Sequence, residues 1–170
     1  MGKKSFMKRQ IKEKIQSGFN CIKIKIGALD FNLECEILKS LRSEYSESDI
    51  ELRLDANGSF SFDSAFEKLE KLSAFKIHSI EQPISVKQWR EMAFLCEKSP
   101  IPIALDEELI GMPSYKEQKE MLLEINPSYI ILKPTLIGGL KKADAWIKLA
   151  SSLNIKWWST SALESNIGLN

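Results

Sequence analysis

The stretch NCIKIKIG at residues 20–27 has the composition of a buried β-strand, yet it carries two lysines. Side chains alternate across a strand, so one face carries three isoleucines and the other carries Cys21, Lys23 and Lys25. An edge strand with one hydrated face would explain the lysines most simply. The alternative is that they serve a functional site, and the rest of the chain favours that alternative.

The composition indicates a globular protein without a strong electrostatic field. The 170 residues are 44% hydrophobic and 28% charged, and 24 basic against 23 acidic residues give a net charge of +1. This balance offers no electrostatic basis for binding nucleic acid or an anionic membrane surface, so we expect neither partner. No apolar run reaches membrane-spanning length, and the basic start lacks the apolar region of a signal peptide. We therefore expect a cytoplasmic protein.

The three cysteines indicate a reduced protein. Cys21, Cys35 and Cys96 are odd in number, lie far apart and show no CxxC spacing. We expect them to be buried, unpaired thiols.

Apolar spacing predicts strands that alternate with helices along the whole chain. The expected strands are at 21–26, 50–55, 78–83, 102–107, 128–134 and 156–161. The expected helices are at 6–17, 30–45, 62–75, 87–98, 114–124 and 140–153, with a last helix opening near Glu164. Strict alternation is typical of a parallel sheet covered by helices, either open and doubly wound or closed into a barrel.

Polar residues at the strand ends favour the barrel. They are separated by 30, 26, 25, 27 and 28 residues and comprise Lys25, Asp55, Glu81, Asp106, Lys133 and Ser161. In an open sheet only one or two strand ends face the ligand crevice, whereas all strand ends of a (β/α)8 barrel converge on one mouth. A complete barrel needs about 250 residues. We therefore predict an α/β fold, an incomplete (β/α)8-type (TIM) barrel with about six parallel strands.

Three carboxylates at this mouth predict a metal site. Asp55, Glu81 and Asp106 follow successive strands and would repel one another without a cation. Oxygen ligands without histidine or cysteine suit Mg²⁺ better than zinc. The single histidine, His78, precedes its strand and is expected to cap or pack there. The alternative is that each acidic residue only caps the following helix.

The lysines predict proton transfer at the same mouth. Lys23 and Lys25 come from one strand, and Lys133 comes from a strand four steps later. A metal and neighbouring cations would lower a lysine pKa towards the range in which the amine accepts a proton. Such a set suits abstraction of a proton next to a substrate carboxylate, with a divalent ion stabilising the enediolate. The alternative is a salt-bridged pair of lysines at a hydrated edge.

Five motifs, in this order, resemble the barrel domain of the enolase superfamily, in its muconate-lactonising-enzyme-like subgroup. They are IKIKIG, LDANGSF, IEQP, ALDEEL and ILKPTLIGG, and the resemblance covers nearly the whole chain. It implies that Mg²⁺ is ligated by Asp55, Glu81 and Asp106. It also implies that Asn57 and Glu107 orient the metal and a lysine.

The resemblance further assigns the lysines. Lys25 would be the general acid and base, Lys23 would support the enediolate electrostatically, and Lys133 would be the second lysine across the site. Thr160 and Ser161 are candidates to donate hydrogen bonds to a substrate carboxylate, although hydroxyls at a strand end can also cap the next helix.

Within the subgroup, SIEQPI, PIALDEELIG and STSALESNIG are most similar to the dehydratases that form 2-succinylbenzoate in menaquinone biosynthesis. The implied partner is a small-molecule carboxylate substrate. A dipeptide epimerase or N-acylamino acid racemase would use the same lysines for proton transfer at one carbon.

The family also implies more structure than 170 residues can supply. We expect residues 1–170 to form a partial C-terminal barrel domain, with the N-terminal capping domain and the last barrel strand absent. An open sheet edge would favour self-association. A non-catalytic barrel fragment is therefore the alternative from another functional class.

Overall fold

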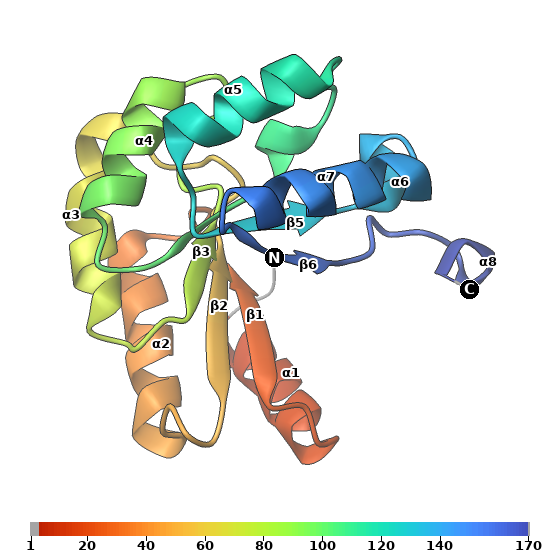
Figure 1. Ribbon diagram of the computed structural model, residues 1–170. Coiled ribbons are helices and arrows are strands. Elements are labelled where there is room, and N and C mark those ends of the chain that lie inside the picture. Colours follow the sequence, from red (N-terminus) through yellow and green to blue (C-terminus); the bar gives the residue numbers. More distant parts are fainter. Residues whose placement is uncertain (1–3, 170) are drawn as a thin grey trace. The chain divides into compact units, whose positions relative to one another are not determined.

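The computed structural model describes residues 4–169, which divide into two compact units. The first unit comprises residues 1–85 and 99–101, and the second comprises residues 86–98 and 102–170. Each unit contains three parallel strands together with helices (Figure 1).

The first unit is a three-stranded parallel sheet with its helices on the outside. Its elements are α1 (Lys4–Gln16), β1 (Cys21–Lys25), α2 (Phe31–Glu44), β2 (Glu51–Asp55), α3 (Phe62–Ser73) and β3 (Ser79–Glu81). The register sets Lys25 opposite Asp55, and Asp55 opposite Glu81. Three ionisable side chains therefore end three neighbouring strands at the same level.

Alternation of side chains forms the core of the first unit. Along β1 the burial pattern switches at every residue, with Ile22 and Ile24 buried and the residues between them exposed. Leu52 and Leu54 are also buried, from the neighbouring strand β2. Asp30 is the N-cap of α2, and its carboxylate accepts hydrogen bonds from the backbone N–H groups of Asn32 and Leu33 in the first turn.

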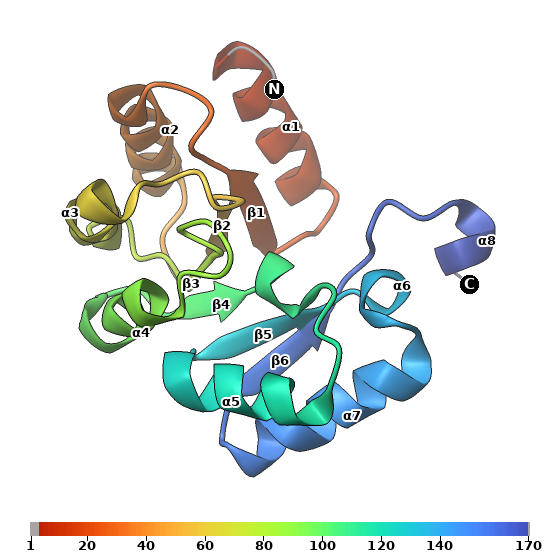
Figure 2. The ribbon, with the colours of Figure 1, turned by 90° about the horizontal axis from the view of Figure 1, so that it is seen from above.

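The second unit repeats the plan with three more parallel strands. Its strands and larger helices are α4 (Trp89–Lys98), β4 (Ile103–Leu105), α5 (Tyr115–Ile125), β5 (Tyr129–Leu132), α7 (Leu140–Ser152) and β6 (Lys156–Ser159). Its short helices are η1 (Glu107–Leu109), α6 (Pro134–Ile137) and α8 (Asn166–Leu169). Strand β5 pairs with both β4 and β6. Figure 2 shows α5 and α7 along one side of β5 and β6.

The core of the second unit centres on the buried Trp146 of α7. Met121 and Leu122 of α5 and Ile130 of β5 are also buried. The Ser114 hydroxyl caps α5 by accepting a hydrogen bond from a first-turn backbone N–H.

The predicted alternation of six strands with helices is confirmed. All observed strands except β2 end one or two residues before their predicted carboxyl ends, where the backbone leaves the ladder to form loops. The sequence patterns did not reveal η1 and α6, because each is a short turn inside such a loop. Within residues 4–169, no helix is long and apolar enough to cross a membrane.

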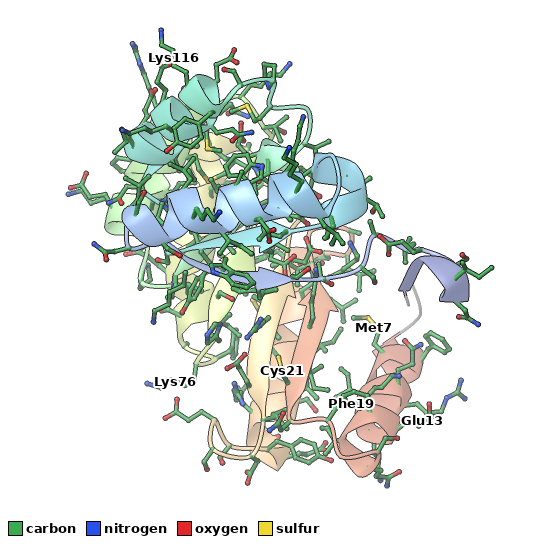
Figure 3. All side chains as sticks on the ribbon, turned by 45° about the vertical axis from the view of Figure 1, so that its right-hand side comes forward. Met7, Glu13, Phe19, Cys21, Lys76 and Lys116 are labelled. Atoms are coloured by element: carbon green, nitrogen blue, oxygen red, sulfur yellow. The ribbon has the colours of Figure 1, made fainter. Side chains whose placement is uncertain are left out.

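The cysteines are free as expected, but the prediction that all are buried is wrong. Cys21 is exposed, and Cys35 and Cys96 are partly buried. Figure 3 labels Cys21 at the start of β1. Its exposure follows from strand alternation, because it shares the face of β1 that carries the two lysines.

The thiols should differ in reactivity. Burial raises the pKa of the Cys96 thiol to about 12, so very little thiolate exists at pH 8. Burial and the hydrogen bond to Glu51 also raise the pKa of Cys21, but its side chain is exposed. We expect iodoacetamide to modify Cys21 at least about tenfold faster than Cys96, as followed by peptide mass spectrometry. Equal rates in the folded protein would contradict this, and in denaturant the difference should vanish.

Candidate active site

The carboxyl ends of β1, β2 and β3 bring two lysines and two carboxylates together. The Lys23 ammonium lies 2.5 Å from Glu81 Oε2 and 2.9 Å from Asp55 Oδ2. The Lys25 ammonium lies 3.3 Å from the same Asp55 oxygen. Both carboxylate side chains are 1% exposed, whereas the lysines are 37% and 55% exposed. The acids are therefore buried behind amines that reach solvent.

Asn57 completes this arrangement. Its side-chain oxygen accepts a hydrogen bond from Lys25 at 2.5 Å, and its backbone N–H donates to Asp55 Oδ1 at 3.1 Å. Asn57 has φ 44°, in the left-handed region that asparagine tolerates better than most residues. This backbone conformation lets one short loop hold both Lys25 and Asp55.

The capping alternative does not account for Asp55. The N-cap position of α3 is Ser61, six residues beyond Asp55, and the Asp55 oxygens instead accept from Lys23, Lys25 and the Asn57 backbone. Glu81 likewise accepts a hydrogen bond from Lys23. The alternative of a salt-bridged lysine pair describes the contacts, but both partner acids are almost completely buried.

The electrostatics of the cluster shift the pKa values of Lys23 and Asp55 in opposite directions. Burial lowers the pKa of Lys23, but the hydrogen bonds and charges of Glu81 and Asp55 outweigh it, so the pKa is raised. Burial alone would raise the pKa of Asp55, yet Lys23 and Lys25 bring it below its usual value. The carboxylate neighbours of Lys23 therefore decide the direction of its shift, and a lysine pKa lowered by a bound metal and neighbouring cations stays a prediction.

These shifts predict how stability depends on pH. The stabilisation of the folded state by Asp55 is fully present above pH 3.8. It is lost as the pH falls through the lowered pKa that Asp55 has in the folded state. The stabilisation of the folded state by Lys23 is fully present below pH 10.5. It is lost as the pH rises through the raised pKa that Lys23 has in the folded state. In EDTA, Lys23→Met should therefore lower the free energy of unfolding most between these limits and less beyond them.

Urea unfolding followed by circular dichroism would measure, at each pH, the difference in the free energy of unfolding between wild type and Lys23→Met. Lys71→Met is the matched control, because Lys71 forms an exposed ion pair with Glu67 on one helix and should change stability much less. A Lys23→Met difference that stays constant down to pH 2 would contradict the assignment.

The second unit holds its own acid and amine pair. Lys133 directly follows β5 and donates to Asp106 Oδ2 at 2.5 Å. Asp106 follows β4 and is 1% exposed, while the Lys133 side chain is 17% exposed. Asp106 precedes η1, but its side chain makes no capping hydrogen bond there. Glu107 is the first residue of η1.

A buried glutamate that sequence reasoning missed supports this region. Glu108 is buried, and its Oε1 accepts hydrogen bonds from the Lys87 backbone at 2.9 Å and from the Trp89 indole at 2.8 Å. It therefore ties the turn after β4 to the segment before α4. In the sequence, Glu108 is an ordinary acidic residue in ALDEEL, and only its contacts reveal its role.

The two hydroxyl candidates lie just beyond β6 rather than within it, as the predicted strand had placed them. The Thr160 backbone N–H donates to Leu132 O at 3.0 Å, so the ladder reaches Thr160. Ser161 is exposed. The following helix, α8, begins only at Asn166.

The first-unit acids fit a hard divalent cation, although no group of three or more His, Cys, Asp or Glu residues is placed to hold a metal ion within residues 4–169. The Lys23 nitrogen lies within 2.9 Å of one oxygen each from Asp55 and Glu81. A cation in the place of this ammonium group would meet two buried carboxylate oxygens, which are ligands that Mg²⁺ prefers.

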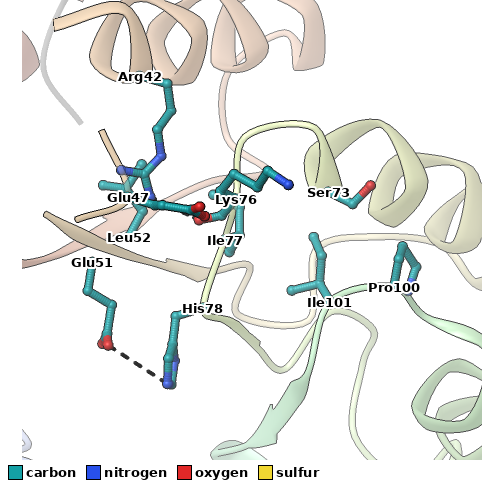
Figure 4. Close-up of a pocket in the computed structure, with 10 residues that line it drawn as sticks. All are labelled: Arg42, Glu47, Glu51, Leu52, Ser73, Lys76, Ile77, His78, Pro100 and Ile101. Atoms are coloured by element: carbon teal, nitrogen blue, oxygen red, sulfur yellow. Dashed lines mark hydrogen bonds and ion pairs between the residues drawn. The ribbon is translucent and has the colours of Figure 1, made fainter. Parts of the chain in front are cut away.

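A cavity of about 530 Å³ lies elsewhere in the first unit, at the amino ends of its strands (Figure 4). It is lined in part by Glu51, which begins β2, and His78, which precedes β3. His78 Nε2 lies 3.9 Å from the Glu51 carboxylate, and its Nδ1 forms a hydrogen bond with Ser79, so it packs near its strand as expected. The Arg42 guanidinium donates to the carbonyls of Phe75 and Ile50. The Arg42 contacts hold loop carbonyls in place. The active site is expected at the carboxyl ends of the strands and not in this cavity.

Comparison with known proteins identifies the family. Residues 6–170 match the family described as "Enolase C-terminal domain-like". This chain belongs to that family. The predicted fold class, the α/β barrel fold of the enolase superfamily with six parallel strands, is thereby confirmed.

The enolase C-terminal domain-like chain is most usefully compared with two curated relatives. It is 52% identical to an o-succinylbenzoate synthase of Desulfotalea psychrophila, over 99% of this chain and 46% of that protein. It is 30% identical to an L-Ala-D/L-Glu epimerase of Francisella tularensis subsp. novicida, over 95% of this chain and 44% of that protein. The chain therefore spans about half the length of these relatives.

Solved structures agree with the family. The crystal structure of MenC from Desulfotalea psychrophila superimposes with a TM-score of 0.93 at 51% identity, over 99% of this chain and 46% of that one. A racemase from Streptomyces coelicolor with bound magnesium gives a TM-score of 0.84 at 22% identity, over 94% of this chain and 47% of that one. The second likeness shows the shared fold of the enolase C-terminal domain-like family.

Proposed function

We propose that this chain is the barrel region of an o-succinylbenzoate synthase. This carbon–oxygen lyase dehydrates 2-succinyl-6-hydroxy-2,4-cyclohexadiene-1-carboxylate to 2-succinylbenzoate in menaquinone biosynthesis. The observation that carries the proposal is the 52% identity with the relative of that name, against 30% with the epimerase. The lysines and acids at the strand ends supply the side chains that this reaction needs.

In the proposed reaction, Lys25 acts as both base and acid. As a neutral amine it removes the proton from the carbon next to the carboxylate, and the electron pair of the broken C–H bond moves into the carboxylate to give an enediolate. The electrons then return and expel hydroxide from the neighbouring ring carbon, and the Lys25 ammonium protonates it to water. The ring becomes aromatic, which favours the products.

The other lysines support the negative charge in this proposal. Lys23 lies between two buried acids and contributes positive charge beside Lys25. Lys133, held by Asp106, would stabilise the enediolate from across the site through a cation–π contact with the ring. Asn57 orients Lys25 through the hydrogen bond described above.

The proposal includes Mg²⁺ as cofactor, with Asp55, Glu81 and Asp106 as ligands and Glu107 orienting them. Mg²⁺ in this place would supply positive charge opposite the substrate carboxylate and so favour loss of the neighbouring proton. The buried oxygens of Asp55 and Glu81 around the Lys23 ammonium support this choice. Thr160 and Ser161 would donate hydrogen bonds to a substrate carboxylate.

The remaining parts of the proposal concern location and partners. A cytoplasmic enzyme with a small-molecule carboxylate substrate, and without nucleic acid or membrane partners, accords with the near-neutral charge and the free thiols. Residues 1–170 as a partial C-terminal barrel domain, and self-association through the open strand edges, also remain predictions.

One experiment separates the two enzymatic candidates. The full-length protein would be assayed with Mg²⁺ for 2-succinylbenzoate formation, and separately for exchange of the α-proton of L-Ala-L-Glu in deuterated water. We expect product in the first assay at a much higher kcat/KM than exchange in the second. Exchange without 2-succinylbenzoate formation would establish the epimerase instead.

A further inference from the structure

Glu34 is a buried carboxylate that the proposed reaction does not use. It lies in the first turn of α2 and is 4% exposed. Its Oε1 accepts hydrogen bonds from the backbone N–H groups of Gly27, at 2.7 Å, and Leu29, at 3.1 Å. Both donors belong to the loop that leaves β1 directly after Lys25. Burying a carboxylate is costly unless it is hydrogen-bonded, so these two contacts hold the loop at a fixed place.

The loop has little freedom where Glu34 holds it. The Ile26 N–H donates to Asp55 O at 2.9 Å, and Gly27 then turns the chain with φ 88°. A Cβ atom at Gly27 would lie 1.7 Å from Ser59 Oγ, so the loop after β1 packs directly on the loop after β2. The backbone that carries Lys25 is thus adjacent to the loop that carries Asn57.

Aromatic packing continues the contact between these two loops. The rings of Phe31, at the start of α2, and Phe60, at the end of the loop after β2, meet edge to face with centroids 6.4 Å apart. The Lys68 ammonium lies 4.4 Å from the centre of the Phe60 ring. Such pairs stabilise contacts by about 0.5–1.5 kcal/mol. At this junction, Glu34 accepts hydrogen bonds from the backbone of the loop after β1.

We propose that Glu34 is a positioning residue for Lys25, an inference that rests on Lys25 being the base in the proposed function. Without the carboxylate, the Gly27 and Leu29 N–H groups lose their acceptor, and the loop after Lys25 loses its anchor. Lys25 then no longer keeps its place beside Asp55 and Asn57. A displacement of about 1 Å at a reacting group lowers the rate about 100-fold.

The geometry also predicts which substitution of Glu34 keeps the contacts to the loop and which one loses them. Glu34 Oε1 makes both loop contacts, and Oε2 has no hydrogen-bond partner within residues 4–169. A glutamine keeps one such oxygen, so Glu34→Gln should retain the anchor although the charge is gone. Glu34→Ala removes the anchor. The pair therefore separates an effect of position from an effect of charge.

The test compares Glu34→Ala and Glu34→Gln with Glu36→Ala, an exposed position on the same helix, in the full-length protein. We expect kcat for 2-succinylbenzoate formation to fall about 10- to 100-fold in Glu34→Ala, with KM and the Mg²⁺ dissociation constant within about threefold of wild type. Glu34→Gln and Glu36→Ala should stay within about threefold in kcat. A normal kcat in Glu34→Ala, or an equal loss in Glu34→Gln, would overturn the inference. If Glu34→Ala does not fold, Glu34→Asp, shorter by one methylene, takes its place.

A second readout does not depend on the reaction. Amide hydrogen exchange of residues 26–33, measured without substrate, should be faster in Glu34→Ala than in wild type and unchanged in Glu34→Gln and Glu36→Ala. Wild-type protein that forms no product would refute the proposed function while leaving this readout intact. Unchanged exchange in Glu34→Ala would refute the role of Glu34 whatever the activity.

Discussion

Replacing Lys25 with alanine in the full-length protein should reduce 2-succinylbenzoate formation by about 10³-fold or more, because general acid–base catalysis contributes on the order of 10²–10⁴-fold and one amine serves both steps. Exchange of the substrate α-proton with deuterated water should disappear together with product formation. The loss should appear in kcat, since in the proposed reaction Lys25 acts on the reacting proton rather than on the rest of the substrate.

The structure predicts that the Lys25→Ala variant folds normally and that Asp55 and Glu81 keep their positions. The Lys25 side chain is 55% exposed, and Lys23 still pairs with both Asp55 and Glu81. Mg²⁺ affinity, measured by calorimetry, should therefore change little. Lys71→Ala, at an exposed lysine of α3, is the matched control and should have wild-type activity. A Lys25→Ala enzyme with wild-type rates would rule out Lys25 as the base.

Replacing Asp55 with asparagine should have the second large effect. Asp55 Oδ2 contacts both Lys23 and Lys25, and its carboxylate is almost completely buried. The amide removes one negative charge from the proposed metal site and leaves two lysines with fewer acidic partners. We expect Mg²⁺ affinity to fall about 100-fold or more and activity to fall with it.

The measurement for Asp55→Asn is Mg²⁺ binding by calorimetry or equilibrium dialysis, which needs no substrate. Glu67→Gln serves as the control, because Glu67 is an exposed acid that pairs with Lys71 away from the strand ends. Chelation by EDTA should likewise abolish wild-type activity, and added Mg²⁺ should restore it. Unchanged Mg²⁺ binding by Asp55→Asn would remove Asp55 from the ligand set.

The alignment of ionisable side chains at neighbouring strand ends could be predicted from the sequence, because it depends on local periodicity. Alternation in IKIKIG separates Ile24 from Lys25, and a repeat of one strand plus one helix aligns Lys25 with Asp55 and Glu81. The register within the first unit confirms this alignment. Roles that came from the family motifs, such as those of Thr160 and Ser161, remain predictions.

Contacts between segments distant in sequence could not be predicted in the same way. Nothing in the pattern around Glu34 shows that it accepts from Gly27, because that contact depends on how a loop folds back onto its helix. The direction of the Lys23 pKa shift likewise depends on which charges stand nearest to it in space, and the sequence does not give these. Cys21 was expected to be buried although its own strand face argued otherwise.

The position of the Lys23 ammonium between Asp55 and Glu81 has a consequence for how the protein matures. The amine offsets one of the two negative charges of the acidic pair, so the two buried carboxylates have a cationic partner without a metal ion. If Mg²⁺ binds as proposed, its entry would exchange one positive group for another. The order of folding first and loading afterwards would suit an enzyme that draws on a freely diffusing, weakly held ion.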